Sequence, residues 1–331
     1  EAGVCDLMRA RPAIAPTYPA RIFCLARGGD WQAATLILNT GQALGDIDPE
    51  MSDLLARFLD PEFADGLDPL PPPSRVSPLV FRLREAIGER LATSQLPRAF
   101  AHADLGDIAG WRNQMEAAER LARVGAISPN TLQSLYTAHI PAASGGVWDR
   151  ATAFQRFDVA VTSGDPGAIA AALPRAWAAM QDARIEVPFA NLYSDALARL
   201  PIGGEAAALI YKIRLLSKGY EQAAQSHTAT TDQERFYAGV ARGRSEGAMP
   251  RGAREQAVAA AFTSASMPED IGALLAAGKL GEALLRTIVV FDEGLTGDPQ
   301  QIGGALAVLR HVGLEDVARR AALQYLILDR N

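Results

Sequence analysis

Short helical stretches that end at glycine or proline recur along almost the whole chain, and they limit its fold more than any other feature. The stretch 31–44 shows the pattern clearly, with Asp30 directly before it as an N-cap. Its apolar side chains return at roughly helical spacing, at Trp31, Ala34, Leu38 and Ala43. Such a pattern predicts an amphipathic helix that buries one face.

Evidence for β-strands is poor. The most strand-like run is Thr287–Phe291, but it continues the helical pattern that begins at Leu280 and has no second run to pair with. Strand and helix patterns do not alternate, which argues against a doubly wound fold. We therefore expect an all-α protein. The expected helices cover residues 21–25, 31–44, 49–58, 79–89, 110–124, 128–139, 147–163, 166–183, 188–200, 205–225, 232–241, 254–264, 268–276, 280–290, 299–312 and 314–328.

A proline-rich segment interrupts the helices. Residues 66–78 read GLDPLPPPSRVSP, and consecutive prolines lack the backbone N–H that a helix needs. We expect an extended crossing, either a linker between domains or a strap on the surface. The expected organisation is therefore N-terminal hairpins over 1–65, the segment 66–78, and a stack of hairpins over 79–331. Alternatively, residues 1–65 and the stack form one continuous solenoid.

A loose internal repeat supports the stack. Gly278 and Gly313, which both end expected helices, are 35 positions apart, and Gly125 and Gly164 are 39 apart. This spacing is close to the ~34-residue period of tetratricopeptide repeats. The run GKLGEAL, residues 278–284, resembles the turn between the helices of such repeats. The resemblance covers about four short stretches without the full Trp/Leu/Gly/Tyr signature, and it implies helical-hairpin repeats forming an α-solenoid, or superhelix.

The two cysteines, Cys5 and Cys24, lie 19 positions apart near the N-terminus. We expect a disulfide that pins an N-terminal arm to the first helix; the alternative is two buried thiols of a cytoplasmic protein. Such a bridge contributes roughly 3 kcal/mol in the chain-entropy model. It is typical of oxidising compartments, so we expect the periplasm. The chain begins at Glu1 rather than Met, which we interpret as removal of a signal peptide, a membrane anchor or a disordered segment.

One catalytic motif has a formal match. Residues 243–247, GRSEG, fit the G-x-S-x-G nucleophile elbow of α/β-hydrolases, with Ser245 as the nucleophile. Asp292 or Asp298, and then His311, follow in the required order. The chemistry needs a strand before the serine and a helix after it, whereas a helical pattern precedes this serine and a loop follows. We therefore interpret the motif as a loop between helices.

Other titratable residues form no recognisable site. The four histidines are isolated in sequence, and no spacing typical of a metal site occurs, so we expect neither metal nor cofactor. His102 and Asp104 form a pair of the kind that is common in turns. Glu116 and Glu119 share a helix face, where we expect solvated surface rather than a glycosidase pair. Residues 145–146 are expected to form a loop rather than a phosphate-binding turn.

Aromatic side chains are few, and the four tryptophans are expected to pack between helices. Several tyrosines cluster in sequence between residues 190 and 240. If they line a concave face they are suitable anchors for a partner, because tyrosine is enriched at binding hot spots; packing in the core is the alternative. The candidate protein-binding residues are Tyr193, Tyr211, Tyr220 and Tyr237.

Composition excludes further classes of function. The net charge is −6, without the basic footprint of a nucleic-acid-binding protein, and no apolar run reaches the ~18 residues of a transmembrane segment. Our leading hypothesis is a non-enzymatic helical-repeat scaffold or adaptor that binds a protein of unknown identity in the bacterial cell envelope. The alternatives are an envelope hydrolase acting on peptidoglycan or an ester, and a carrier of a lipid or small ligand inside the superhelix.

Overall fold

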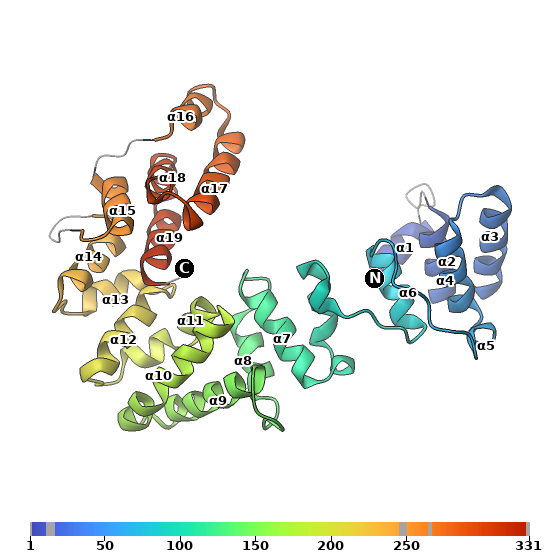
Figure 1. The fold of residues 1–331 in the computed structure, drawn as a ribbon, viewed down its shortest axis with the longest axis horizontal. Helices are drawn as coiled ribbons and strands as arrows, with labels where there is room; N and C mark the ends of the chain where they lie inside the picture. The colour runs from blue at the N-terminus through green and yellow to red at the C-terminus, as the bar shows by residue number, and fades with distance from the viewer. Residues whose placement is uncertain (1, 11–16, 245–249, 264–266, 329–331) are drawn as a thin grey trace. The chain divides into compact units, whose positions relative to one another are not determined.

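The structure is a computed structural model that describes residues 2–10, 17–244, 250–263 and 267–328. Within these ranges all regular secondary structure is helical, which confirms the expected all-α fold (Figure 1). The chain divides into two compact units, residues 1–104 and residues 105–331, called unit 1 and unit 2 below. None of the described helices has the length and hydrophobicity needed to cross a membrane.

Unit 1 is a small helical unit with an aliphatic core. Its α-helices are α1 (Ala2–Ala10), α2 (Tyr18–Arg27), α3 (Trp31–Leu44), α4 (Pro49–Leu59), α5 (Pro61–Ala64) and α6 (Pro78–Ala86). Short 3-10 helices follow at Thr93–Gln95 and Arg98–Leu105. The core lies between α2, α3, α4 and α6 and includes Ile22, Leu38, Leu55 and Leu83. The expected N-terminal arm is itself a helix, α1, which the sequence patterns did not predict.

Local signals set the ends of α3. The helix begins where the Asp30 carboxylate accepts a hydrogen bond from the backbone N–H of Ala33, as the sequence predicts. It ends at Gly45, whose φ of 73° is a conformation that glycine adopts without a steric penalty. Inside the helix, a Cβ on Gly41 would lie 2.6 Å from Ile47 Cδ1, so glycine permits close packing there.

The proline-rich segment is a strap held within unit 1. Arg84, only 4% exposed, donates hydrogen bonds to the carbonyl groups of Leu70 and Pro71. Glu89 accepts from the Leu70 N–H, and Glu50 accepts from Ser74. These bonds fix the strap on α4 and α6 of the same unit. The two compact units meet at residues 104–105, and the strap's polar groups are satisfied inside unit 1.

Unit 2 contains helices α7 to α19. They are α7 (Trp111–Ala122), α8 (Pro129–Thr137), α9 (Val147–Ser163), α10 (Pro166–Ala183), α11 (Glu186–Ala198), α12 (Gly204–Leu215), α13 (Tyr220–Ser226), α14 (Asp232–Ala241), α15 (Ala253–Thr263), α16 (Glu269–Ala276), α17 (Leu280–Thr296), α18 (Pro299–His311) and α19 (Glu315–Ile327), with a 3-10 turn at Asp107–Ala109. The strand-like run 287–291 lies inside α17, as expected for a helix.

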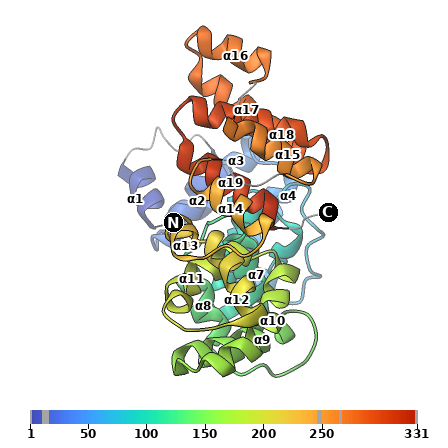
Figure 2. The ribbon, with the colours of Figure 1, turned by 90° about the vertical axis from the view of Figure 1, so that its left-hand side faces the viewer.

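Two large clusters of buried side chains form the core of unit 2. From α7 to α14, helices that follow one another in sequence pack together. Later helices break this order, because α19 packs against α14 and α15, and α18 lies against both α15 and α17 (Figure 2). An ideal solenoid has contacts only between neighbouring repeats. The all-helical class is thus established, whereas the solenoid arrangement stays a prediction.

One expected helix is two helices. The sequence pattern predicts a single helix over 205–225, but the chain turns between α12 and α13. The turn is held by α11, because Ser194 accepts a hydrogen bond from the Ser217 hydroxyl and Asn191 accepts one from the Lys218 N–H. Apolar periodicity continues through the turn, so it does not reveal this tertiary contact.

Candidate functional site

The four candidate tyrosines lie in the core of unit 2. Each is at most 4% exposed, and none presents its ring to solvent. Tyr193 packs against Phe154, Phe157 and Phe189. Burial corrects the expectation of a tyrosine-lined face, and core packing, the alternative, accounts for these side chains. The other three are Tyr211, Tyr220 and Tyr237, and their hydroxyls face Glu234 O, Asp316 Oδ1 and Leu326 O respectively.

A buried charge cluster joins α7, α8, α9 and α10. Glu119, expected on solvated surface, is 2% exposed. Its Oε1 accepts hydrogen bonds from the Tyr136 hydroxyl at 2.5 Å and from Arg150 Nε at 2.8 Å, and its Oε2 accepts from Arg150 Nη2 at 2.9 Å. Arg150 also donates to Asp182 at 2.9 Å. Burial, together with the Glu119 carboxylate, raises the pKa of Tyr136 well above its ordinary value.

The Glu119 cluster joins helices to one another. Both oxygens of Glu119 accept hydrogen bonds from its neighbours, and a buried carboxylate needs such partners to offset its loss of hydration. Glu116, one turn earlier, is paired with Arg112 at the surface. The two carboxylates therefore lie in different environments, and the expectation of solvated surface is confirmed only for Glu116.

A second polar group surrounds His227, whose ring stacks on Tyr211 with centroids 3.8 Å apart. His227 Nε2 lies 3.4 Å from Glu234 Oε2. Glu234 also caps α14, since it accepts hydrogen bonds from Thr230 and forms a capping box with Thr231. Burial favours the neutral acid, but the hydrogen bonds from Thr230, His227 and Thr231 together outweigh it and lower the pKa of Glu234. The Glu234 carboxylate therefore caps the N-terminal end of α14.

The hydrolase motif has the wrong flanking structure. Ser245 lies outside the described residues, but the element before it is α14, a helix, and the next element is α15. The strand that a nucleophile elbow requires is therefore not present before it. His311 is exposed at the C-terminal end of α18. Asp104 accepts hydrogen bonds from Arg90 and Thr93. No group of side chains suited to a metal ion occurs within the described ranges.

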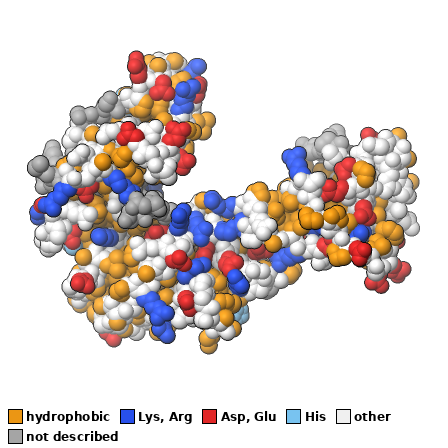
Figure 3. Space-filling model, in the orientation of Figure 1, with side chains coloured by type: hydrophobic (Ala, Val, Ile, Leu, Met, Phe, Trp, Pro, Cys, Tyr) orange, Lys and Arg blue, Asp and Glu red, His pale blue; other side chains and the backbone are white. Residues whose placement is uncertain are grey.

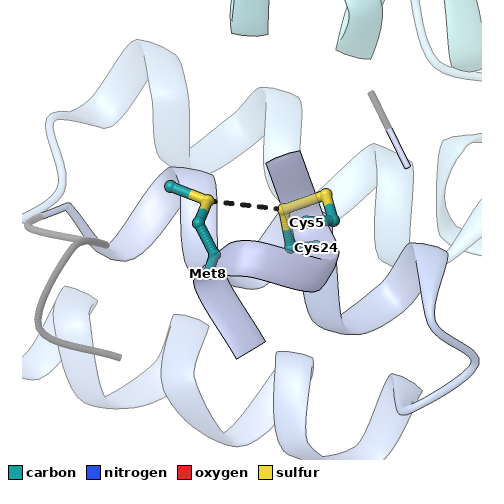
Figure 4. Close-up of a disulfide and its surroundings, with 3 residues drawn as sticks. All are labelled: Cys5, Met8 and Cys24. Atoms are coloured by element: carbon teal, nitrogen blue, oxygen red, sulfur yellow. Dashed lines mark hydrogen bonds between the residues drawn. A yellow bond between two sulfur atoms is a disulfide. The ribbon is translucent and has the colours of Figure 1, made fainter. Parts of the chain in front are cut away.

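A disulfide joins α1 to α2 in unit 1. Cys5 and Cys24 are bonded, with their Cα atoms 5.1 Å apart, and the Met8 sulfur lies 3.7 Å from Cys24 Sγ (Figure 4). Most of α1 faces solvent, including Val4 and Leu7. Because α1 buries little apolar surface, the covalent bond is a main attachment of this helix to unit 1.

The outer side of α3 is exposed and carries no charge. No charged residue occurs between Asp30 and Asp46, although charged residues make up 21% of the chain. Ala34, Leu38 and Gly41 are buried on the inner side, whereas Trp31 and Ala43, which the spacing placed on the buried side, are exposed. The exposed residues of the opposite side, called the α3 face, are Gln32, Leu36, Asn39, Thr40, Ala43 and Leu44. Leu36 and Leu44 are 67% and 63% exposed.

The Thr40 hydroxyl on the α3 face already has a hydrogen-bond partner within the helix. The Thr40 hydroxyl donates to the Leu36 carbonyl one turn earlier, so the side chain offers mainly its methyl group. The face therefore combines leucine and alanine with two neutral amides. Surface helices normally expose charged residues, and depletion of charge is typical of the centre of a protein interface.

The helix α17 has an exposed apolar side of a different kind. Its buried positions are small or polar, namely Ala283, Thr287 and Gly294. A Cβ on Gly294 would lie 3.0 Å from Ile302, so α17 approaches α18 closely through its small residues. Four of the larger apolar residues point outward and form the α17 face, namely Leu285, Ile288, Val289 and Leu295 at 67%, 62%, 55% and 42% exposure. Hydrophobic side chains border acidic and basic ones on this part of the surface (Figure 3).

No protein-family model, curated protein sequence or solved structure matches this chain.

Proposed function

We propose that this protein is a non-enzymatic helical scaffold that binds another protein through the α3 face of unit 1. The supporting observation is a 14-residue helix that exposes one side to solvent without a single charge. Leu36 and Leu44 supply apolar contact, and Gln32 and Asn39 supply hydrogen bonds. A partner surface that is equally free of charge fits it best, because burying an unpaired charge there is costly.

The proposed setting is an oxidising compartment of the cell envelope, with the helices of unit 2 arranged as a solenoid-like stack. The bonded pair Cys5 and Cys24 supports the compartment, since disulfides persist where thiols are not kept reduced. Packing between consecutive helices from α7 to α14 supports the stack.

Site-specific photocrosslinking in the native cell tests this proposal. A photoreactive residue replaces Leu36 in the full chain, and the matched control carries it at Val159, an exposed apolar residue on α9. We expect one discrete protein adduct from position 36 and none of that size from position 159. Equal adducts from both positions, or none from position 36, would overturn the assignment.

A pair of charge substitutions sharpens the test. Leu36→Glu places a carboxylate in the centre of the α3 face, whereas Val159→Glu makes the same change elsewhere. Both positions are exposed, so each change alters stability by about 0.5 kcal/mol or less. In this test the photoreactive residue replaces Leu44. We expect Leu36→Glu to abolish the adduct with the partner, and Val159→Glu to leave it unchanged.

A further inference from the structure

We propose that the α17 face joins two copies of this chain in an antiparallel helix pair with two-fold symmetry. This interaction is separate from the proposed function, since it uses unit 2 and leaves the α3 face untouched. The argument rests on how charges are placed around the apolar residues of α17.

The apolar residues of the α17 face have a centre near Val289. Leu285 lies one turn before it, Ile288 lies beside it, and Leu295 lies nearly two turns after it. Arg286 and Glu293 are seven positions apart, which is about two turns, so they share one flank of this face. Their midpoint falls between residues 289 and 290. The opposite charges are therefore placed symmetrically about the centre of the apolar residues.

A two-fold axis through that midpoint makes the face complementary to itself. In an antiparallel pair, Arg286 of one copy lies opposite Glu293 of the second copy, and the reverse contact forms at the other end. Leu285 lies beside Leu295 of the second copy, and Val289 meets its own counterpart. Asp292, which is also exposed, lies among the apolar residues of this face, four positions after Ile288 and three before Leu295, so each copy also brings one carboxylate to the contact. One axis thus pairs Arg286 with Glu293 at both ends and brings the apolar residues of the two copies together.

The charges on this flank are available for such a contact. Arg286 lies 3.5 Å from Asp270 and 3.4 Å from Glu282, and its side chain is half exposed. Exposed pairs of this kind contribute little, so the guanidinium can turn to a new partner at low cost. Glu293 is exposed and has no ion-pair partner among the described residues.

The charges also argue against an anionic membrane as the occupant. The exposed acids near the α17 face are Glu282, Asp292 and Glu293, whereas the bases are Lys279 and Arg286. A helix that lies on an anionic bilayer carries an excess of basic residues on its polar side. The excess here is acidic, so a second copy fits the face better.

The size of the face sets the expected strength of association. A helix of 17 residues is ~25 Å long, and one side of it buries roughly 300 Å² per copy. Stable interfaces bury about 800 Å² per partner. We therefore expect a weak dimer.

Sedimentation velocity of the full chain between about 5 and 500 µM measures this association. We expect a concentration-dependent shift from monomer to dimer. Ile288→Glu is expected to remove the shift, whereas Val159→Glu, the same kind of change on α9, leaves it in place. A wild-type chain that stays monomeric throughout, or a dimer that survives Ile288→Glu, would overturn the proposal.

Charge reversal tests the symmetry directly. Arg286→Glu and Glu293→Arg each place like charges opposite one another at both ends, so each variant alone is expected to associate roughly fivefold or more weakly. An equimolar mixture of the two variants restores both attractive pairs, and we expect a heterodimer at least as strong as the wild-type dimer. A mixture that remains monomeric, with wild-type chain dimeric, would exclude the antiparallel register.

Discussion

Unit 1 and unit 2 are stabilised by different means. Unit 1 has 104 residues and a small aliphatic core, supplemented by a disulfide and by the hydrogen bonds that Arg84 and Glu89 form with the strap. Unit 2 has 227 residues and two extensive cores rich in aromatic rings. A smaller domain buries a smaller fraction of its surface, so it depends more on crosslinks and specific polar contacts.

The two exposed faces differ in a corresponding way. The α3 face is neutral throughout, so it offers no charge that selects an orientation. The α17 face is flanked by charges of both signs, whose order along the helix suits an antiparallel second copy. Charge patterns of this type set partner choice and register more than affinity. On this basis we propose a foreign partner for the α3 face and a second copy for the α17 face.

The largest predicted effect is on unit 2. Glu119→Ala leaves Arg150 buried without its main partner, which costs about 3–5 kcal/mol. Glu116→Ala is the matched control, and its exposed pair with Arg112 contributes under about 1 kcal/mol. Urea unfolding followed by hydrogen–deuterium exchange of unit 2 peptides measures both. Equal losses of stability from the two changes would show that the buried cluster stabilises unit 2 no more than an exposed ion pair does.

Loss of the disulfide is predicted to act on unit 1 alone. Replacing Cys5 and Cys24 with serine removes about 3 kcal/mol, because the unfolded chain regains the freedom of the closed loop. Peptide-resolved hydrogen exchange should show faster exchange in residues 2–10 and 17–104 and no change in unit 2. Faster exchange in both units would mean that they unfold as one cooperative system.

The third prediction concerns close packing between α15 and α18. A Cβ on Gly303 would lie 2.7 Å from the Ala257 carbonyl oxygen, so Gly303→Ala forces two backbones apart and costs about 1–3 kcal/mol. Gly272 in α16 has open space around it, and Gly272→Ala should stabilise by about 0.4–1 kcal/mol. Thermal unfolding of both variants measures the contrast. An unchanged melting temperature for Gly303→Ala would show that α15 and α18 adjust without strain.

The smallest predicted effect is a dependence on alkaline pH that belongs to unit 2. Burial raises the pKa of Tyr211, Tyr220 and Tyr237 to about 12, against about 10 in the unfolded chain. The contribution of these tyrosines to the free energy of unfolding is complete below pH ~10. It is lost as the pH rises through their pKa in the folded state, because their hydroxyls release protons at lower pH in the unfolded chain. From pH 9 to 10 the loss is a few tenths of a kcal/mol per tyrosine.

Tryptophan fluorescence of a Trp31→Phe variant follows this pH effect, since the remaining tryptophans all lie in unit 2. Urea midpoints at pH 9 and pH 10 give the change in stability. A midpoint that stays constant, or rises, would contradict the burial of these tyrosines.

Sequence patterns predicted the local structure well where the cause is local. The helix over 31–44 has the predicted bounds because Asp30 caps it and a glycine follows it. The helices over 147–163, 166–183 and 232–241 are likewise as predicted. The disulfide between Cys5 and Cys24 was also predicted, since these are the only two cysteines in the chain. In contrast, the sequence patterns did not predict α1.

The periodicity of apolar residues in the sequence does not predict which helix faces are exposed as candidate binding surfaces. The amino-acid sequence determines that α17 is a helix and that much of it is apolar. Only the tertiary structure decides that Ala283, Thr287 and Gly294 face inward, because their small volume lets α18 approach, which leaves Ile288 and Val289 outside. The same holds for Glu119, whose burial depends on a partner 31 positions away. Periodicity identifies the faces of a helix, but long-range packing decides which face is covered.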